Sequence, residues 1–388
     1  MPAEEHELGA RSRGPRKEGR EHDPPTKRVL LAAPTSLPAR STRGPTGGSP
    51  VISICIPTAD PGASFERCLD SLRRQRSAPP FELLVCLNGG VTEPEAVTDL
   101  WPGATVVSVA RRNPGAARNA LIQHARGDLL LFLDDDVTLA PDLLNRLATL
   151  ARRRTNDGVF GGPNVTPPNS TWFQRVQGAV LASLLGSGPV RRRYGRHPAG
   201  AANERFFILC NLAVRREVMA SFDPDLVCAE ENALLMEMSS RGIAMHYDPK
   251  MMVFHDRRDS LSGFAKQLLK YGRGRGQIIR RRPYSARLEY LAPPALVLYL
   301  SFLPLLVPLA PWAAGLGAAY VGMCIAGGAK IGITMKSFSS ALLACALVAV
   351  THSCYGVGVL LGVARPKRAH PAVPAAVLVR PEQRTETA

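Results

Sequence analysis

Two long stretches near the end of this 388-residue chain contain no charged residue, and they constrain its fold more than any other feature. They run from Tyr290 to Ala329 and from Ser337 to Ala364, and both exceed the roughly 20 apolar residues that cross a bilayer. In lipid, only a helix or a closed barrel satisfies every backbone hydrogen bond, so the stretches predict membrane helices. The first contains several prolines and fits either one long kinked span or a hairpin of two short ones.

The chain is strongly basic, with a formal net charge of +16, and much of that charge lies next to the first membrane stretch. Residues Arg257 to Arg287 include ten Lys or Arg and one acidic residue, Asp259. Such charge marks the cytoplasmic flank of membrane helices, and the basic segment 365–368 then favours an even number of crossings. We therefore expect a multi-pass protein of the cytoplasmic membrane, in contact with lipid, whose folded domain before the membrane stretches faces the cytoplasm.

The composition argues against several other classes of protein. Charge alone would suit a nucleic-acid-binding protein, but no such motif accompanies it, so we expect no nucleic acid partner. A channel or transporter is a poor fit because His352 is the only residue of the uncharged stretches that titrates in the usual range. The eight cysteines form no CxxC pair and have no zinc spacing, which indicates reduced thiols.

Continuous apolar segments alternate with helical periodicity over the first part of the folded chain. The apolar segments predict buried strands at 51–57, 81–88, 106–110 and 128–134. Alternation with helices indicates a parallel α/β sheet, in which ligands bind beyond the carboxyl ends of the strands. Further strands are predicted at 158–162 and 205–210, and the Gly-, Arg- and Pro-rich segment 186–204 predicts a mobile loop.

Three adjacent aspartates, Asp134, Asp135 and Asp136, follow the strand predicted at 128–134. Like charges this close repel one another and resist burial, so they lie either in water or beside a cation. Mg²⁺ and Mn²⁺ prefer carboxylate and phosphate oxygens, and Mg²⁺ usually takes one or two protein carboxylates together with substrate phosphates. The pattern fits a metal–diphosphate site, although a solvated acidic turn is the alternative.

Several segments, in order between residues 51 and 283, resemble family 2 glycosyltransferases. They are VISICIPTAD, CLDSLRRQ, NPGAARNALIQHARGDLLLFLDDD, CNLAVRREV, FDPDLVCAEENALLMEM and HDRRDSLSGFAKQLLKYGRGRG. Membrane spans after the catalytic domain also occur in this family, notably in exopolysaccharide enzymes of the succinoglycan type. The resemblance implies an α/β GT-A fold, a Rossmann-like mixed sheet flanked by helices, followed by C-terminal transmembrane helices. The expected parts are a disordered basic tail at 1–49, the catalytic domain at 50–288, transmembrane helices at 289–364 and a short basic tail at 365–388.

The resemblance also implies roles on the donor side. Asp136 would ligate a divalent metal, Mg²⁺ or Mn²⁺, with Asp134 and His255, although a structural role for His255 is as well supported. The residues expected to contact the nucleotide-sugar donor are Pro57, Thr58, Asp60, Asn88, Arg118, Asp134 and Asp135. For Arg118 a local salt bridge is the alternative. The family often has an Asp where this chain has Leu87, so the nucleotide base stays open.

On the acceptor side, Glu230 and Glu231 occupy the position of the family's Glu-Asp pair, whose second member usually acts as catalytic base. Glu231 would therefore be the base, with one more methylene than Asp; two exposed helix acids are the alternative. The segment QLLKY is similar to the Q-x-x-R-W motif of membrane-bound polysaccharide synthases. It implies an acceptor side formed by Gln267, Lys270, Tyr271 and Arg273, and a basic helix that binds anionic lipid is the alternative.

The sequence thus predicts an inverting glycosyltransferase. It would move a sugar from a nucleotide-diphosphate donor to a saccharide or lipid-linked acceptor, for polysaccharide or cell-envelope glycan synthesis. The alternative is a catalytically degenerate GT-A module that binds nucleotide or polysaccharide without transfer, and Leu87 and the Glu at position 231 motivate it.

Overall fold

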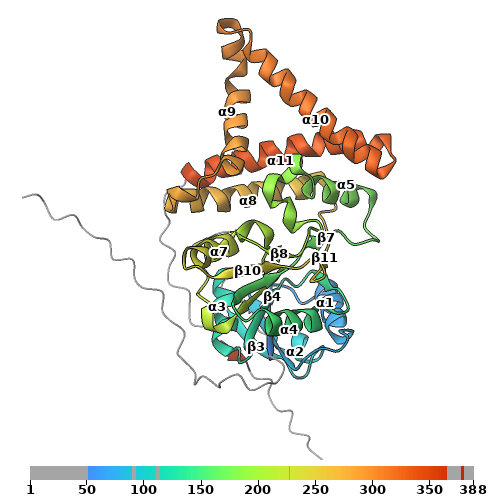
Figure 1. Ribbon diagram of the computed structural model, residues 1–388, viewed down its shortest axis with the longest axis vertical. Coiled ribbons are helices and arrows are strands. Elements are labelled where there is room, and N and C mark those ends of the chain that lie inside the picture. The colour runs from blue at the N-terminus through green and yellow to red at the C-terminus, as the bar shows by residue number, and fades with distance from the viewer. Residues whose placement is uncertain (1–50, 90–92, 111–113, 227, 365–376, 380–388) are drawn as a thin grey trace, which may run out of the picture. The chain divides into compact units, whose positions relative to one another are not determined.

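The computed structural model describes residues 51–89, 93–110, 114–226, 228–364 and 377–379 (Figure 1). The predicted tail 1–49 lies outside the described residues, as does most of the predicted tail 365–388. An α/β domain comes first along the described chain, and long helices follow it.

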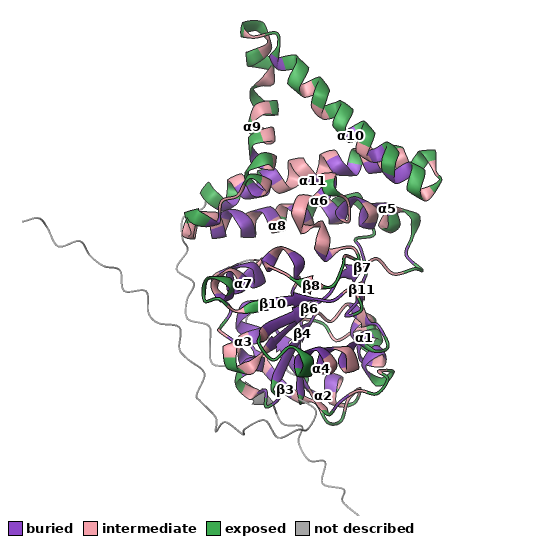
Figure 2. Ribbon diagram, viewed as in Figure 1, coloured by how far each residue is buried: buried purple, intermediate pink, exposed green. Residues whose placement is uncertain are grey.

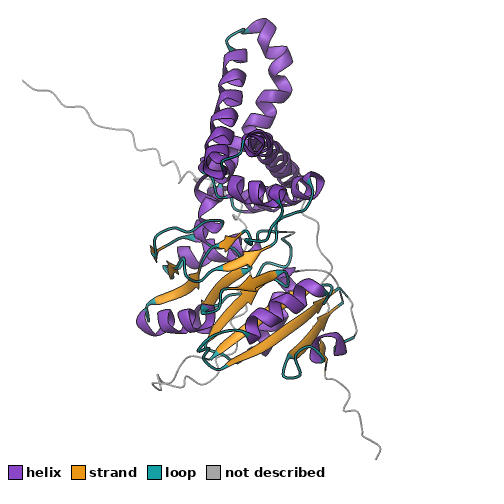
Figure 3. Cartoon of the chain, turned by 90° about the vertical axis from the view of Figure 1, so that its right-hand side faces the viewer, coloured by secondary structure: helices purple, strands orange, loops and turns teal. Residues whose placement is uncertain are grey.

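A mixed sheet forms the centre of the α/β domain, with helices on both of its faces (Figure 3). In spatial order its strands are β12 (Val377–Val379), β3 (Thr105–Val109), β2 (Phe81–Asn88), β1 (Ile52–Thr58), β4 (Leu129–Leu133), β9 (Asn211–Arg215), β6 (Asp157–Gly161), β10 (Ala244–Tyr247) and β8 (Gly200–Ala201). The neighbours β3, β2, β1 and β4 pair in parallel, whereas β9 is antiparallel to both β4 and β6. This mixed α/β sheet confirms the predicted fold class.

Alternate residues of the central strands enter two separate hydrophobic cores, one on each face of the sheet. One core takes apolar side chains from α1 (Ala63–Arg73), α2 (Glu95–Thr98) and α4 (Leu143–Arg153). The other takes them from α3 (Pro114–His124) and α7 (Glu230–Ser240). The central strands are therefore buried on both sides (Figure 2), which explains why they are continuous apolar runs in the sequence.

Local structure between β7 and β10 differs from the prediction. The strand predicted at 205–210 is wrong: this segment contains most of a 3-10 helix, η2 (Glu204–Phe206), and the strand β9 begins only at Asn211. The segment predicted as a loop contains part of α6 (Leu184–Ser187), a 3-10 helix η1 (Gly188–Arg193) and β8. Arg193 fixes this region because its guanidinium donates to the backbone carbonyls of Glu204 and Arg205. The strand predicted at 158–162 is confirmed as β6.

A second, three-stranded sheet lies beyond the carboxyl end of β4. Its strands are β5 (Val137–Leu139), β11 (Val253–His255) and β7 (Asn164–Val165), in that spatial order. Because β5 begins directly after Asp136 and β11 ends at His255, their pairing brings these two residues together.

Three of the helices that follow the α/β domain are long and apolar enough to cross a membrane. They are α9 (Leu288–Leu309), α10 (Ala313–Met335) and α11 (Phe338–Ala364). The first uncharged stretch therefore forms two helices rather than one span, with the turn after Leu309, and α9 keeps four prolines in its interior.

The last apolar helix, α11, packs against the preceding part of the chain at several points along its length. It runs beside α8 (Leu261–Arg281) and near α5 (Trp172–Leu181) (Figure 1). Near its start the Trp172 indole N–H donates to the Ser340 hydroxyl at 2.8 Å, and further along the His352 Nε2 lies 2.8 Å from the carbonyl oxygen of Leu185. In contrast, most of α9 and α10 is exposed or half-buried (Figure 2).

Candidate active site

The three aspartates lie in the turn between β4 and β5, and each has a different partner. Asp134 Oδ1 accepts from Arg118 Nη2 at 2.7 Å, and Asp135 Oδ2 accepts from the Thr58 hydroxyl at 2.6 Å. Asp136 Oδ1 lies 3.2 Å from His255 Nε2. The cluster therefore tolerates its own repulsion because two of the three carboxylates face a basic group and the third accepts a hydrogen bond.

The environment changes the acidity of these groups. Burial raises the pKa of Asp135 to about 6, and the hydrogen bond from Thr58 limits the rise. Burial opposes a charge on His255, but the Asp136 carboxylate more than offsets this and raises the pKa of His255 to about 10. The pKa of Asp136 is lowered in turn, because His255 outweighs the effect of burial. A carboxylate–imidazolium pair thus forms at this end of the sheet.

Arg118 joins the aspartates to the acidic pair on α7. Its Nη1 donates to Glu230 Oε1 at 2.9 Å while its Nη2 binds Asp134. The Arg118 side chain is 5% exposed and that of Glu230 is 7% exposed, so this pair is shielded from solvent. Glu230 and Asp134, which lie far apart in the sequence, are therefore held on one guanidinium.

Glu231 is buried beside a second arginine, Arg193 of η1. Its Oε1 accepts from Asn232 Nδ2 at 2.7 Å and lies 3.4 Å from Arg193 Nη1. Burial raises the pKa of Glu231, Glu230 adds to the rise, and Arg193 opposes it. The alternative of two exposed helix acids is wrong, because Glu230 and Glu231 are both buried.

The donor atoms near the aspartates fit a divalent cation. Asp136 Oδ1 and His255 Nε2 are 3.2 Å apart. That spacing would let both atoms bind one cation at about 2.1 Å, in place of the proton they share. The other ring nitrogen of His255 lies 3.3 Å from the amide nitrogen of Asn164. No three His, Cys, Asp or Glu side chains of the described residues form a metal-binding group, so further ligands would have to be substrate oxygens or water.

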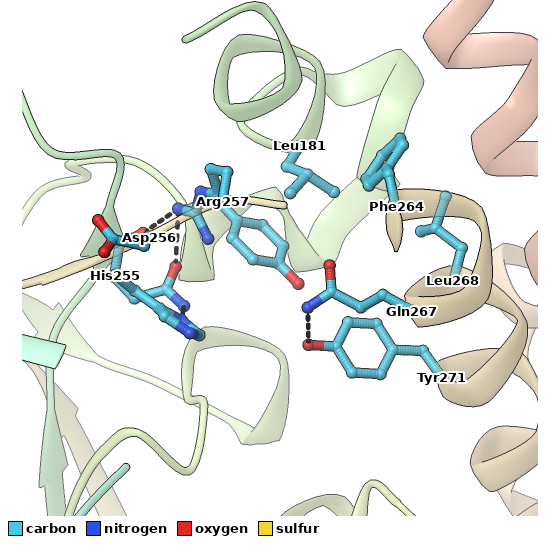
Figure 4. Close-up of a pocket in the computed structure, with 10 residues that line it drawn as sticks. Leu181, His255, Asp256, Arg257, Phe264, Gln267, Leu268 and Tyr271 are labelled. Atoms are coloured by element: carbon cyan, nitrogen blue, oxygen red, sulfur yellow. Dashed lines mark hydrogen bonds between the residues drawn. The ribbon is translucent and has the colours of Figure 1, made fainter. Parts of the chain in front are cut away.

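A small pocket adjoins His255 and contains part of the predicted acceptor side (Figure 4). Gln267 and Tyr271 of α8 line it, and Gln267 Nε2 donates to the Tyr271 hydroxyl at 3.1 Å. Arg257 enters from the segment after β11, with its guanidinium carbon 5.3 Å from the centre of the Tyr194 ring. The Arg257 Nη2 donates to the Asn164 carbonyl at 2.8 Å. Gln267 and Tyr271 therefore lie close to the candidate metal ligand His255.

The remaining predicted residues lie at the edges of this region. Thr58 and Asn88 end β1 and β2 and are buried, Pro57 is half-buried, and Asp60 is exposed just beyond β1. Lys270 is exposed on α8 and Arg273 is half-buried. Leu87 belongs to the hydrophobic core.

The sequence did not single out Arg193, Asn164 or Arg257, although all three are buried at the site. Arg193 lies in an Arg-rich run of a segment without periodicity, so no local pattern distinguishes it from its half-buried neighbours Arg191 and Arg192. For Arg257, position was the available signal, because it follows His255 by two residues.

Comparison with known proteins identifies the α/β domain. Residues 53–222 match the family model of Glycosyl transferase family 2. The O-antigen biosynthesis protein RfbC of Myxococcus xanthus is 28% identical over 229 residues, which are 55% of this chain and 18% of that protein. The succinoglycan biosynthesis protein ExoM of Rhizobium meliloti is 23% identical over 186 residues, 45% of this chain and 56% of that protein. The match thus spans less than two thirds of either relative.

A solved structure supports the same fold. The mannosyltransferase PcManGT from Pyrobaculum calidifontis, in complex with GDP-Man and Mn²⁺, superposes with a TM-score of 0.52 and 18% identity. The superposition covers 80% of this chain and 87% of that protein.

Proposed function

Because residues 53–222 belong to glycosyltransferase family 2, we propose that the chain is an inverting glycosyltransferase. It moves a sugar from a nucleotide-diphosphate donor to a saccharide or lipid-linked acceptor, in polysaccharide or cell-envelope glycan synthesis. The observation that carries the proposal is the Arg118 bridge, which holds the acidic pair of α7 beside the aspartates after β4. Glu230, the neighbour of the candidate base Glu231, thus shares one guanidinium with Asp134, a candidate donor contact. The relatives in O-antigen and succinoglycan biosynthesis support a glycan acceptor.

On the donor side, we assign nucleotide contacts to residues at the carboxyl ends of β1, β2 and β4. They are Pro57, Thr58, Asp60, Asn88 and Asp135. Parallel strands of α/β sheets present their ligand-binding residues at this edge. Arg118 acts in this proposal as a positioning residue, because both of its carboxylate partners belong to the site.

Asp136 and His255 would hold a divalent metal, Mg²⁺ or Mn²⁺, and Asp134, which binds Arg118, would become a third ligand only by moving away from that arginine. When bound, such a cation neutralises the charge that develops on the leaving diphosphate. The Pyrobaculum enzyme, which binds GDP-Man and Mn²⁺, supports both a metal and a nucleotide-sugar donor here.

Glu231 acts as the general base. Its carboxylate takes the proton of an acceptor hydroxyl while that oxygen attacks C1 of the donor sugar. The bond from C1 to the diphosphate breaks at the same time, and the nucleoside diphosphate leaves from the opposite face. The raised pKa of Glu231 makes the carboxylate a stronger base than an exposed glutamate.

The acceptor approaches from the side of α8 and the membrane. Gln267 and Tyr271 lie by the pocket next to His255, while Lys270 and Arg273 offer positive charge to an acceptor phosphate or to lipid headgroups. We assign the catalytic domain to the cytoplasmic side, because the basic residues precede α9. In this arrangement α9 and α10 cross the membrane as a hairpin, and α11, held against α5, α6 and α8, does not cross.

The test combines a screen of nucleotide sugars with three variants of the full-length protein in membranes. Wild-type protein is expected to hydrolyse one donor in the presence of Mn²⁺ and to transfer its sugar when an acceptor is added. Asp136→Asn should lose metal-dependent hydrolysis, and Glu231→Gln should lose transfer by about 100-fold or more, as expected for a general base. Glu237→Gln is the matched control, because Glu237 lies on the same helix and pairs only loosely with Arg282 at 3.7 Å.

Two results would decide against the proposal. Donor binding without hydrolysis or transfer would favour the degenerate binding module, in which Arg193 merely neutralises Glu231. Full transfer by Glu231→Gln would remove Glu231 from the reaction.

A further inference from the structure

Helices α8 and α11 touch backbone to backbone through four glycines. A Cβ added at Gly272 of α8 would lie 2.2 Å from the Tyr355 carbonyl oxygen, and one at Gly276 would lie 2.2 Å from that of Val359. From the other side, a Cβ at Gly358 of α11 would lie 2.4 Å from the Leu269 carbonyl oxygen. Gly272 and Gly276 on one helix and Gly358 and Gly362 on the other have the spacing that lets membrane helices approach closely. The contact therefore fixes α8 to α11 with little freedom to slide.

The opposite side of α8 makes an equally close contact with the loop that precedes α7, the helix that bears the candidate base. A Cβ at Gly274 would lie 2.4 Å from the carbonyl oxygen of Cys228. Cys228 is followed by Ala229, the left-handed N-cap of α7 with φ of 64°, and then by Glu230 and Glu231. Any shift of α8 is thus transmitted to the start of α7.

Arg275 lies between these contacts and is buried. Its guanidinium carbon is 3.9 Å from the ring centre of Tyr290, at the start of α9, and its side chain hydrogen-bonds with Tyr355 of α11. Among the described residues its Nη1 finds no hydrogen-bond partner. The apolar helices α9 and α11 therefore hold the Arg275 guanidinium in a fixed position.

The charged and titratable groups that face Glu231 come from three elements and one loop. They are Arg193 at the end of η1 and Tyr194 directly after it, Glu230 from α7, Cys228 from the loop before α7 and Arg275 from α8. Arg193 and Arg275 both favour the ionised form of Glu231. Arg193 is held by the α/β domain, whereas Arg275 is held by the apolar helices.

We propose that Arg275 is a positioning residue for Glu231, and that α11 keeps it in place through the glycine contact with α8. The inference rests on the proposed role of Glu231 as base. It makes the C-terminal helices part of the acceptor half of the site as well as a membrane anchor. A displacement of α11 would therefore move both Arg275 and the start of α7.

The experiment measures the pH dependence of sugar transfer, with the donor KM as a second readout, for variants of the full-length protein in membranes. Arg275→Gln should move the acid limb of the transfer profile up by about 1 pH unit, because losing a nearby cation raises the pKa of a carboxyl group. Arg275→Lys should return the acid limb of the transfer profile toward its wild-type position. Gly358→Ala should lower transfer about tenfold or more with an unchanged donor KM. Gly322→Ala, on α10, has nothing within 4 Å of its Cβ and should match the wild type.

An unchanged acid limb in Arg275→Gln, or wild-type transfer by Gly358→Ala, would overturn this inference even when Glu231→Gln is inactive and the proposed function stands. If Glu231→Gln transfers normally, both proposals fail together. Should Gly358→Ala fail to accumulate, Tyr355→Phe replaces it. That change removes only the hydroxyl bonded to Arg275, and an unchanged acid limb there would also count against the inference.

Discussion

Replacing Arg118 with methionine removes the cation that joins the two halves of the candidate site. The guanidinium, 5% exposed, binds Glu230, 7% exposed, and Asp134, 32% exposed. Methionine keeps much of the side-chain volume, so the change is mainly one of charge and hydrogen bonding. It leaves the Glu230 carboxylate buried without its partner.

The expected loss of folding free energy follows from how exposed the two ion pairs of Arg118 are. Removing one partner of a buried ion pair costs about 3–5 kcal/mol, because the remaining charge stays buried. The pair with the part-exposed Asp134 adds at most about 1 kcal/mol. A total of about 4 kcal/mol lowers the melting temperature of a domain of this size by about 8–16 °C.

Thermal unfolding of the purified protein in detergent, followed by tryptophan fluorescence, measures the effect. The matched control is Arg67→Met, because Arg67 and Asp256 form an exposed pair at 3.2 Å with side chains 55% and 50% exposed. This control should lower the free energy of unfolding by no more than about 1 kcal/mol. The double variant Arg118→Met with Glu230→Gln should recover much of the loss, since it removes the unpaired charge. If Arg118→Met melts no lower than Arg67→Met, the bridge does not stabilise the fold and our reasoning about it is wrong.

Two further predictions concern the proposed membrane hairpin of α9 and α10 and the segment between β6 and β7 that contains Gly162. If α9 and α10 cross as a hairpin, a membrane-impermeant maleimide should label Trp312→Cys and Ser337→Cys from opposite faces of sealed vesicles; labelling from one face would contradict the hairpin. A Cβ at Gly162 would lie 1.9 Å from the Met251 carbonyl oxygen, so Gly162→Ala should cost about 1–3 kcal/mol of stability and weaken metal-dependent donor hydrolysis. Gly103→Ala, where nothing lies within 4 Å, should leave both unchanged, and equal melting temperatures for the two variants would refute this assignment.

Much of the fold was predictable because its strands are buried on both faces. Residues 83–87 and 129–133 are apolar throughout, a pattern typical of a central strand between two helical layers. The region between β7 and β10 was not predictable in this way. There η1, η2 and β8 are short, and contacts between distant residues, such as Arg193 with Glu204, determine them more than local propensity does.

The same distinction holds for the candidate site: residues in segments with a recognisable pattern were predictable, and contacts between distant residues were not. Asp134, Asp136 and Glu231 stand in recognisable segments, and the resemblance to known glycosyltransferases indicated them directly. Their partners Arg118 and His255 were also indicated, but the bridge from Arg118 to Glu230 could not be, because it joins helices distant in sequence. Arg275 looked like one more basic residue at a membrane flank. Its burial between α9 and α11 depends on glycine contacts that only the folded chain reveals.

The three-stranded sheet has a consequence for the order in which the protein becomes functional during synthesis. His255 stands opposite Val137 in the pairing of β11 with β5, and a slip of one residue would turn its ring to the other face. The imidazole therefore joins Asp136 only after the ribosome has released the chain beyond residue 255. A nascent polypeptide that already contains all three aspartates cannot yet offer this carboxylate–imidazole pair to a cation. The candidate cation site is thus completed only when β11 pairs with β5, late in the synthesis of the α/β domain.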